Sequence, residues 1–130
     1  RQGYYMLQSN FAMANQDLDT AEASIRKSLA SKSDLMGTSQ EGTSYLQLGG
    51  IAIQKGDTKE AIKNLKIAIQ KGLPDDDNLA TAYLQMCTIY AQRREIRVAK
   101  EYLRRANNLK VKNDEIKKHL KDINKQMARA

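Results

Sequence analysis

Apolar residues recur three and four positions apart along most of the chain, which is the spacing that lines one face of an α-helix. The pattern breaks at three short polar stretches, Gln16-Asp17, Gly56-Asp57 and Arg94-Glu95. We therefore predict six helices, at about residues 3–15 and 18–31, 42–55 and 58–71, then 78–92 and 95–109. Each successive pair is expected to form a hairpin with a tight turn.

A seventh helix is predicted at about residues 113–128, with Asn113 as its N-cap. Its apolar stripe consists of Ile116, Leu120, Ile123 and Met127. We expect this helix to cover the core of the last hairpin. The first helix of the third hairpin, at about 78–92, is expected to take Asp77 or Asn78 as its N-cap.

Three segments of the chain align with one another without internal gaps, starting at Tyr4, Ser44 and Ala82. Each has a tyrosine in second place, a small residue four positions later and an alanine twelve positions after that. These residues are Tyr5, Tyr45 and Tyr83, then Ser9, Gly49 and Cys87, then Ala21, Ala61 and Ala99. Small residues at fixed points allow two helix backbones to approach closely, so the chain is predicted to be an internal repeat.

With the Leu48-Gly49 pair and Gly56-Asp57 at the turn, the chain resembles the tetratricopeptide repeat family over about residues 2–111. The second copy is the best match to the family pattern. The resemblance implies an all-α fold, a right-handed superhelix of three hairpins at about 2–35, 42–75 and 80–111. Residues 112–130 are expected to form a basic amphipathic capping helix at its C-terminal end.

The composition excludes several classes of site. Aromatic residues make up 5% of the chain and tryptophan is absent, which argues against a stacking platform for bases. One cysteine, Cys87, and one histidine, His119, exclude an internal disulfide and a multi-histidine metal site. No apolar run approaches the roughly 20 residues that span a bilayer. Because the sequence opens at Arg1 rather than Met, close to the start of an expected helix, we interpret it as a fragment of a longer protein, whose compartment is not predicted.

No motif predicts catalysis. The stretch QKGDTKEA, residues 54–61, lacks the spacing of a phosphate-binding loop and is interpreted as a helix turn. The acidic run at 75–77 is interpreted as a helix-capping loop, and Cys87 as a buried small residue. His119 is expected to be exposed on the last helix. We therefore predict a protein that is not an enzyme, with no cofactor, no metal and no small-molecule substrate.

The resemblance places the first helix of each hairpin on the concave face of the superhelix. Its outward positions carry no charge and combine apolar residues with amides. They are Met6, Asn10 and Met13, then Leu46, Gln47, Gly50, Ile53 and Gln54, then Leu84, Gln85, Thr88 and Gln92. We predict that this groove binds a peptide segment or helix of a partner protein. The alternative is that a neighbouring helix of the intact protein fills it.

The net charge of +7 is carried by the last third of the chain. Residues 1–90 have a net charge of −1 and residues 91–130 a net charge of +8. The predicted basic surface consists of Arg93, Arg94, Arg97, Arg104, Arg105, Lys117, Lys121 and Lys125. The alternative function is that this surface docks on a polyanion, either nucleic acid or an anionic membrane. A solvated basic face that only keeps the protein soluble is the simpler interpretation.

Overall fold

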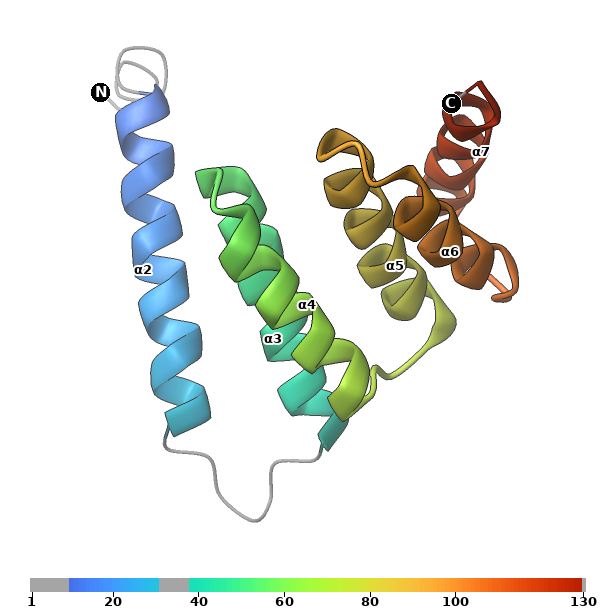
Figure 1. Cartoon of the computed structure of the whole chain (residues 1–130). Helices are drawn as coiled ribbons and strands as arrows, with labels where there is room; N and C mark the ends of the chain where they lie inside the picture. Colours follow the sequence, from blue (N-terminus) through green and yellow to red (C-terminus); the bar gives the residue numbers. More distant parts are fainter. Residues whose placement is uncertain (1–9, 31–37, 130) are drawn as a thin grey trace.

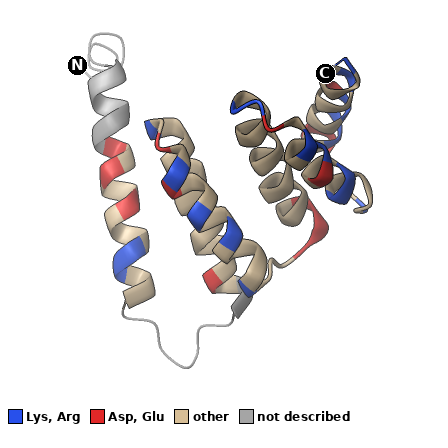
Figure 2. Ribbon diagram, in the orientation of Figure 1, with Lys and Arg blue, Asp and Glu red and all other residues tan. Residues whose placement is uncertain are grey.

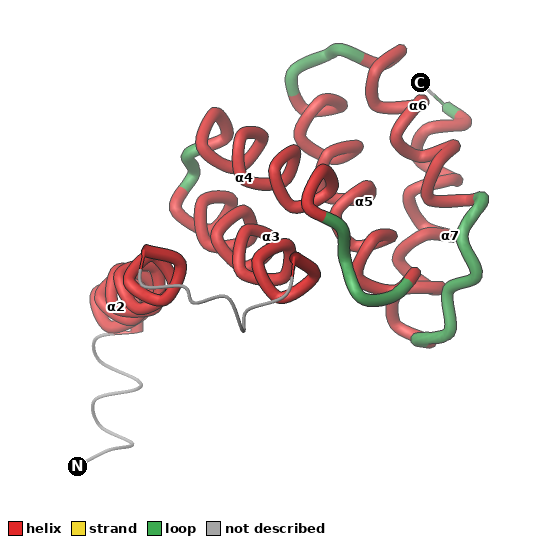
Figure 3. The backbone as a smooth tube through the Cα atoms, turned by 90° about the horizontal axis from the view of Figure 1, so that it is seen from below, coloured by secondary structure: helices red, strands yellow, loops and turns green. Residues whose placement is uncertain are grey.

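The computed structural model describes residues 10–30 and 38–129, with backbone alone for 10–16, 38 and 39. Every regular element within these ranges is a helix, so the all-α prediction is confirmed (Figure 3). The helices are α2 (Asn10–Ala30), α3 (Thr38–Lys55), α4 (Thr58–Lys71), α5 (Asp76–Gln92), α6 (Ile96–Asn107) and α7 (Asp114–Ala128).

Two antiparallel helical hairpins form the centre of the molecule (Figure 1). One is made of α3 and α4, the other of α5 and α6, and they meet where α4 packs on α5. Helix α2 lies along α3 at one end of the row, and α7 packs on both α5 and α6 at the other. The predicted hairpins at 42–71 and 78–109 are therefore present in the structure.

The predicted turn at Gln16-Asp17 is absent, and this prediction was wrong. Helix α2 runs without a break from Asn10 to Ala30, so the separate helices expected at 3–15 and 18–31 are not found in the described residues. The physical reason is local: residues 15–20, NQDLDT, contain no glycine or proline, and apolar Leu18 continues the helical pattern. Nothing there forces the chain out of the helix. Residues 1–9 lie outside the described part.

The other two turns share one geometry. At the first, Gly56 has a φ of 81°, and the N–H of Asp57 donates to the carbonyl of Ala52 at 2.8 Å. At the second, Arg94 has a φ of 64°, and the N–H of Glu95 donates to the carbonyl of Tyr90 at 2.9 Å. A left-handed residue with this hydrogen bond is a helix C-terminal stop.

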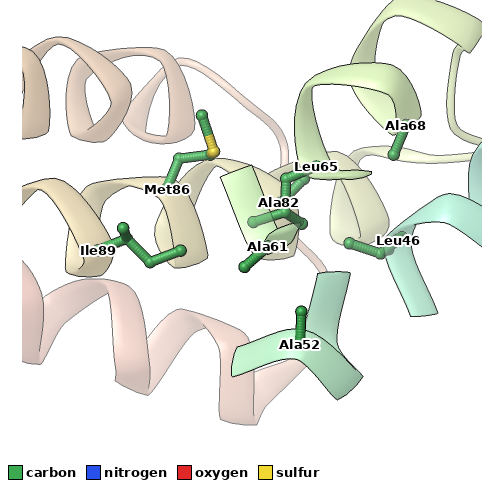
Figure 4. Close-up of a cluster of buried hydrophobic side chains, with 8 residues drawn as sticks. All are labelled: Leu46, Ala52, Ala61, Leu65, Ala68, Ala82, Met86 and Ile89. Atoms are coloured by element: carbon green, nitrogen blue, oxygen red, sulfur yellow. The ribbon is translucent and has the colours of Figure 1, made fainter. Parts of the chain in front are cut away.

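Two clusters of buried side chains form the core. The first joins α3, α4 and α5 and consists of Leu46, Ala52, Ala61, Leu65, Ala68, Ala82, Met86 and Ile89 (Figure 4). The second joins α5, α6 and α7 and consists of Leu84, Cys87, Ala99, Leu103, Ala106, Ile123 and Met127. The repeated small residues pack as predicted: a Cβ on Gly49 would come within 2.7 Å of Cδ2 of Leu65.

The acidic run after α4 does more than cap a helix. The N-cap of α5 is Asp75, whose carboxylate accepts from the N–H of Asn78 at 2.8 Å, so the prediction of Asp77 or Asn78 was wrong by two or three residues. Asp77 instead accepts from the backbone N–H of Lys112, at 2.8 Å. This bond, together with one from Lys110 N–H to Asp76 at 2.9 Å, ties the loop between α6 and α7 to the start of α5.

Helix α7 follows its prediction closely. Asn113 is its N-cap and accepts from the N–H groups of Glu115 and Ile116, at 2.9 and 3.0 Å. Ile123 and Met127 are buried against α5 and α6, and Leu120 is half-buried. The last helix thus covers the apolar end of the second hairpin, as a terminal helix must in a repeat fold.

Candidate protein-binding groove

Three adjoining hollows run across α2, α3, α5 and α7. The first, about 540 Å³, lies between α2 and α3 and is lined by Ala21, Ser24, Ile25, Gln47, Gly50, Ile51 and Gln54. The second, about 360 Å³, is lined by Ile53, Gly56, Thr58, Gln85, Thr88, Ile89, Gln92 and His119. The third, about 260 Å³, is lined by Cys87, Thr88, Ala91, Gln92, Ile123, Gln126 and Met127. We call these hollows together the groove.

The helical repeat of α3 and α5 puts the lining residues on one side. Gln47, Gly50 and Gln54 follow at intervals of three and four on α3, as do Gln85, Thr88 and Gln92 on α5. The second and third hollows share Thr88 and Gln92. The first meets the second where the two helices approach, because a Cβ on Gly50 would lie 3.9 Å from Nε2 of Gln85.

The walls of the groove carry no aspartate, glutamate, lysine or arginine. Its polar groups are amides and hydroxyls from residues such as Gln47, Gln54, Gln92 and Thr88, all exposed. The side-chain oxygen of Gln85 is buried, and it has no hydrogen-bond partner among the described atoms. Such a surface offers apolar contact together with neutral donors and acceptors.

Seven of the predicted groove residues lie in these hollows: Gln47, Gly50, Ile53, Gln54, Gln85, Thr88 and Gln92. Met6 lies outside the described residues, and the side chains of Asn10 and Met13 are also outside the described part. Leu46 and Leu84 were wrongly assigned to the open surface, because they are 8% and 2% exposed. Leu46 packs in the first core cluster, and Leu84 packs in the second, which also contains Ile123 and Met127 of α7.

Sequence reasoning missed the contributions of α2 and α7 to the walls. Ser24 and Ile25 line the first hollow, while His119 and Gln126 line the second and third. His119 is exposed, as predicted, but it faces the groove. The spacing of the apolar stripe on α7 indicates which face is buried, yet it does not indicate over which part of α5 that face lies.

Ion pairs attach α2, one wall of the groove, to the first hairpin. The ammonium group of Lys55 contacts the carboxylates of Asp19 and Glu22, the latter at 2.8 Å. Arg26 contacts Glu22 at 3.1 Å and reaches Glu60 of α4 at 3.4 Å. The bond from Lys55 lowers the pKa of Glu22, with a smaller effect from Arg26, and the bond to Asp19 raises the pKa of Lys55. These partly exposed pairs each contribute little stability, because water screens them.

The predicted basic surface divides into two parts (Figure 2). On α6, Arg104 and Arg105 both bind Glu101, at 2.7 and 3.2 Å, and Arg104 is the main cause that lowers the pKa of Glu101 to about 2. Arg93 contacts Glu95 at 3.6 Å and lies over the ring of Tyr90. Much of the positive charge on this side is therefore neutralised within the fold. Arg94 and Arg97 are exposed.

On α7, by contrast, Lys117, Lys121 and Lys125 are all exposed. Across the described ranges none of the three makes an ion pair. They line a shallow hollow of about 460 Å³ whose other lining residues are Leu120, Asn124 and Ala128. These three lysines thus form an exposed basic group on one helix.

Other features that suggested chemistry have structural roles. Cys87 is completely buried, and burial raises the pKa of its thiol, so it is a packing residue on α5. Asp57 accepts from the N–H of Glu60 at 3.1 Å as the N-cap of α4. Over the described residues, no cluster of three or more histidine, cysteine or acidic side chains is arranged to hold a metal ion. In the same residues, no helix has the length and hydropathy needed to cross a membrane.

Two stacked helical hairpins followed by α7 define a helical-repeat architecture. The family model for the tetratricopeptide repeat matches residues 42–70, which contain most of α3 and α4. The resemblance to that family is therefore confirmed at this hairpin. Tetratricopeptide repeats are generally non-catalytic modules that bind other proteins. No curated protein and no solved structure matches the chain.

Proposed function

We propose that this chain is a non-catalytic adaptor that binds an uncharged segment of a partner protein in its groove. The observation that carries the proposal is the run of three adjoining hollows without an aspartate, glutamate, lysine or arginine on their walls. Most solvent-exposed surfaces mix charges with apolar atoms, and the fully buried centre of a protein interface is depleted of charge. A neutral wall therefore suits contact with another neutral surface.

The chemistry of the groove selects the kind of segment. Ile25, Ile51 and Ile53 offer apolar contact, while the glutamines at 47, 54 and 92 can both donate and accept hydrogen bonds. A segment with small or apolar side chains and free backbone amides satisfies both demands. A strongly charged segment would lose hydration on entry and find no counter-charge.

A peptide selection tests this proposal directly. A displayed library of random peptides is selected against the full chain, and the enriched peptides are measured by fluorescence anisotropy. The groove variant combines Gln54→Arg with Gln92→Arg, both exposed and both on the walls. The matched control combines Gln70→Arg and Asn108→Arg, which are exposed outside the groove and add the same charge.

We expect the enriched peptides to be uncharged, and the groove variant to weaken their binding at least tenfold because a desolvated guanidinium is left without a partner. The control variant should bind within twofold of the unchanged chain. Enrichment of charged peptides alone, or equal loss in both variants, contradicts the proposal.

A further inference from the structure

The exposed face of α7 forms a second surface, separate from the groove. Three of the lysines on α7, Lys117, Lys121 and Lys125, follow at intervals of four residues, which places their Cα atoms about 6 Å apart along the helix axis. Leu120 and Ala128 line the same shallow hollow as the three lysines. Apolar side chains bordered by charged ones are the usual organisation of a protein–protein contact.

This face is also held in place. Asn124, which lines the hollow, exchanges two hydrogen bonds with Asn107 of α6, both 2.9 Å long. Its amide also donates to the carbonyl of Leu120 at 2.9 Å. On the opposite side of α7, Ile123 and Met127 are buried in the core. The helix therefore presents the lysines on a fixed support, and little ordering is needed when a partner binds.

From this arrangement we infer that the lysine face of α7 docks an acidic amphipathic helix of a partner protein. The partner helix carries carboxylates at intervals of four residues, which match Lys117, Lys121 and Lys125, and an apolar side chain that fills the hollow over Leu120. Opposite charges that flank an apolar seam set the pairing and orientation of helices in this way.

Two observations favour a helix over a polyanion. A phosphate backbone gains nothing from Leu120 and Ala128 at the centre of the face. Two arginines of α6 that would extend a basic track, Arg104 and Arg105, are already bound to Glu101. A nucleic acid gains affinity from many phosphate contacts along a continuous track, and three lysines on one helix supply few.

The test uses the full chain and two labelled 20-residue peptides of equal composition. In one, glutamates four residues apart flank a leucine stripe; in the other, the glutamates are moved to the far side of the helix. The α7 variant replaces Lys117, Lys121 and Lys125 by glutamine. Its control makes the same three changes at Lys59, Lys63 and Lys66, which are exposed on α4 and form no ion pair in the described part.

We expect only the first peptide to bind. Its affinity should fall about tenfold in the α7 variant, because three exposed ion pairs are lost together and each contributes little. The α4 control should change its affinity less than twofold. Replacing the exposed Ala128 by leucine enlarges the apolar centre without disturbing the core, and should tighten peptide binding several-fold.

Duplex DNA and phosphatidylserine vesicles serve as the competing ligands. The acidic-helix inference is overturned in favour of a polyanion if DNA or vesicles bind more tightly than the first peptide. In that case the affinity for the polyanion falls in the α7 lysine variant and does not change in Ala128→Leu. Equal binding of the two peptides, or equal loss in the α4 control, also overturns it. Every substitution in this experiment lies outside the groove. Success or failure of the acidic-helix inference is therefore independent of the test of the groove.

Discussion

Gly56 and Arg94 adopt the same left-handed backbone conformation at equivalent positions, one at the end of each complete hairpin's first helix. Their φ angles are 81° and 64°. The residue that follows each of them donates its N–H to the carbonyl five positions back, at 2.8 and 2.9 Å. Glycine adopts this conformation freely, whereas arginine must bring its Cβ close to its own carbonyl. The second hairpin therefore stores strain that the first does not.

Arg94→Gly should stabilise the chain, because it removes this strain. The expected gain in the free energy of unfolding is about 0.5 kcal/mol, after the greater freedom of glycine in the unfolded chain is subtracted. Gly56→Ala should do the reverse and cost about 1 kcal/mol. Urea unfolding followed by circular dichroism measures both changes. A loss of stability in Arg94→Gly as large as that in Gly56→Ala would show that the conformation carries no strain.

Three glycines of α3 should respond very differently to alanine. A Cβ at Gly50 has only the amide of Gln85 nearby, at 3.9 Å, so Gly50→Ala should stabilise the helix by about 1 kcal/mol. A Cβ at Gly42 would come within 2.0 Å of the backbone oxygen of Gly72, so Gly42→Ala should cost about 2 kcal/mol. The change in stability for Gly49→Ala should lie between these two values, because the side chain of Leu65 can move aside whereas a backbone oxygen cannot. Thermal unfolding of the three variants checks this order, and a stabilised Gly42→Ala would refute it.

Asp77 should contribute to stability through the loop that it binds. Its carboxylate accepts from the N–H groups of Lys112 and Asn113, at 2.8 and 3.4 Å. Asp77→Ala should lower the free energy of unfolding by about 1 kcal/mol, because these donors lose a charged acceptor. The loop that leads into α7 is then held less firmly against α5. Asp122→Ala, an exposed change on α7 itself, is the control and should stay within about 0.5 kcal/mol. Amide hydrogen exchange in the loop 108–113 should quicken only in the first variant.

The carboxylate of Glu101 should titrate at unusually low pH. Arg104, with help from Arg105, lowers its pKa from an ordinary 4.5 to about 2 in the folded chain. Because the folded pKa lies below the unfolded one, the interaction stabilises the fold above about pH 4.5 and is lost as the pH falls toward 2. Carbon-detected NMR of the glutamate carboxyls measures the value directly. In a variant with Arg104→Gln and Arg105→Gln, the pKa should return toward 4.5, and an unchanged value would contradict the assigned cause.

The sequence predicted the two complete hairpins well because local chemistry specifies them. Gly56, Asp57 and Asn113 mark helix ends through backbone conformation and capping, and the structure bears out each of them. The same helix-end residues allowed us to predict which residues line the groove, since a turn of known position determines which side of the next helix faces outward. Seven of the predicted groove residues lie in the hollows for this reason.

The errors have a different origin. The first hairpin was predicted from homology between segments, although residues 15–20 contain no helix-ending residue, and α2 is continuous there. Leu84 was assigned to the groove because periodicity alone cannot show that α7 covers that part of α5. The first error is local, because the alignment was given more weight than the absence of a helix-ending residue. The second concerns how separate helices pack, and long-range packing leaves only a weak trace in residue spacing. The contribution of His119 to the groove was missed for the same reason.

The most direct test of the groove as the binding site is NMR mapping with an uncharged peptide from the selection. We predict that the backbone amides shifted on binding are those of Gln47, Gln54, Thr88 and Gln92 on α3 and α5, and that the shifts disappear in the variant with Gln54→Arg and Gln92→Arg. Shifts confined to the outer surfaces of α4 and α6 would contradict the proposed function.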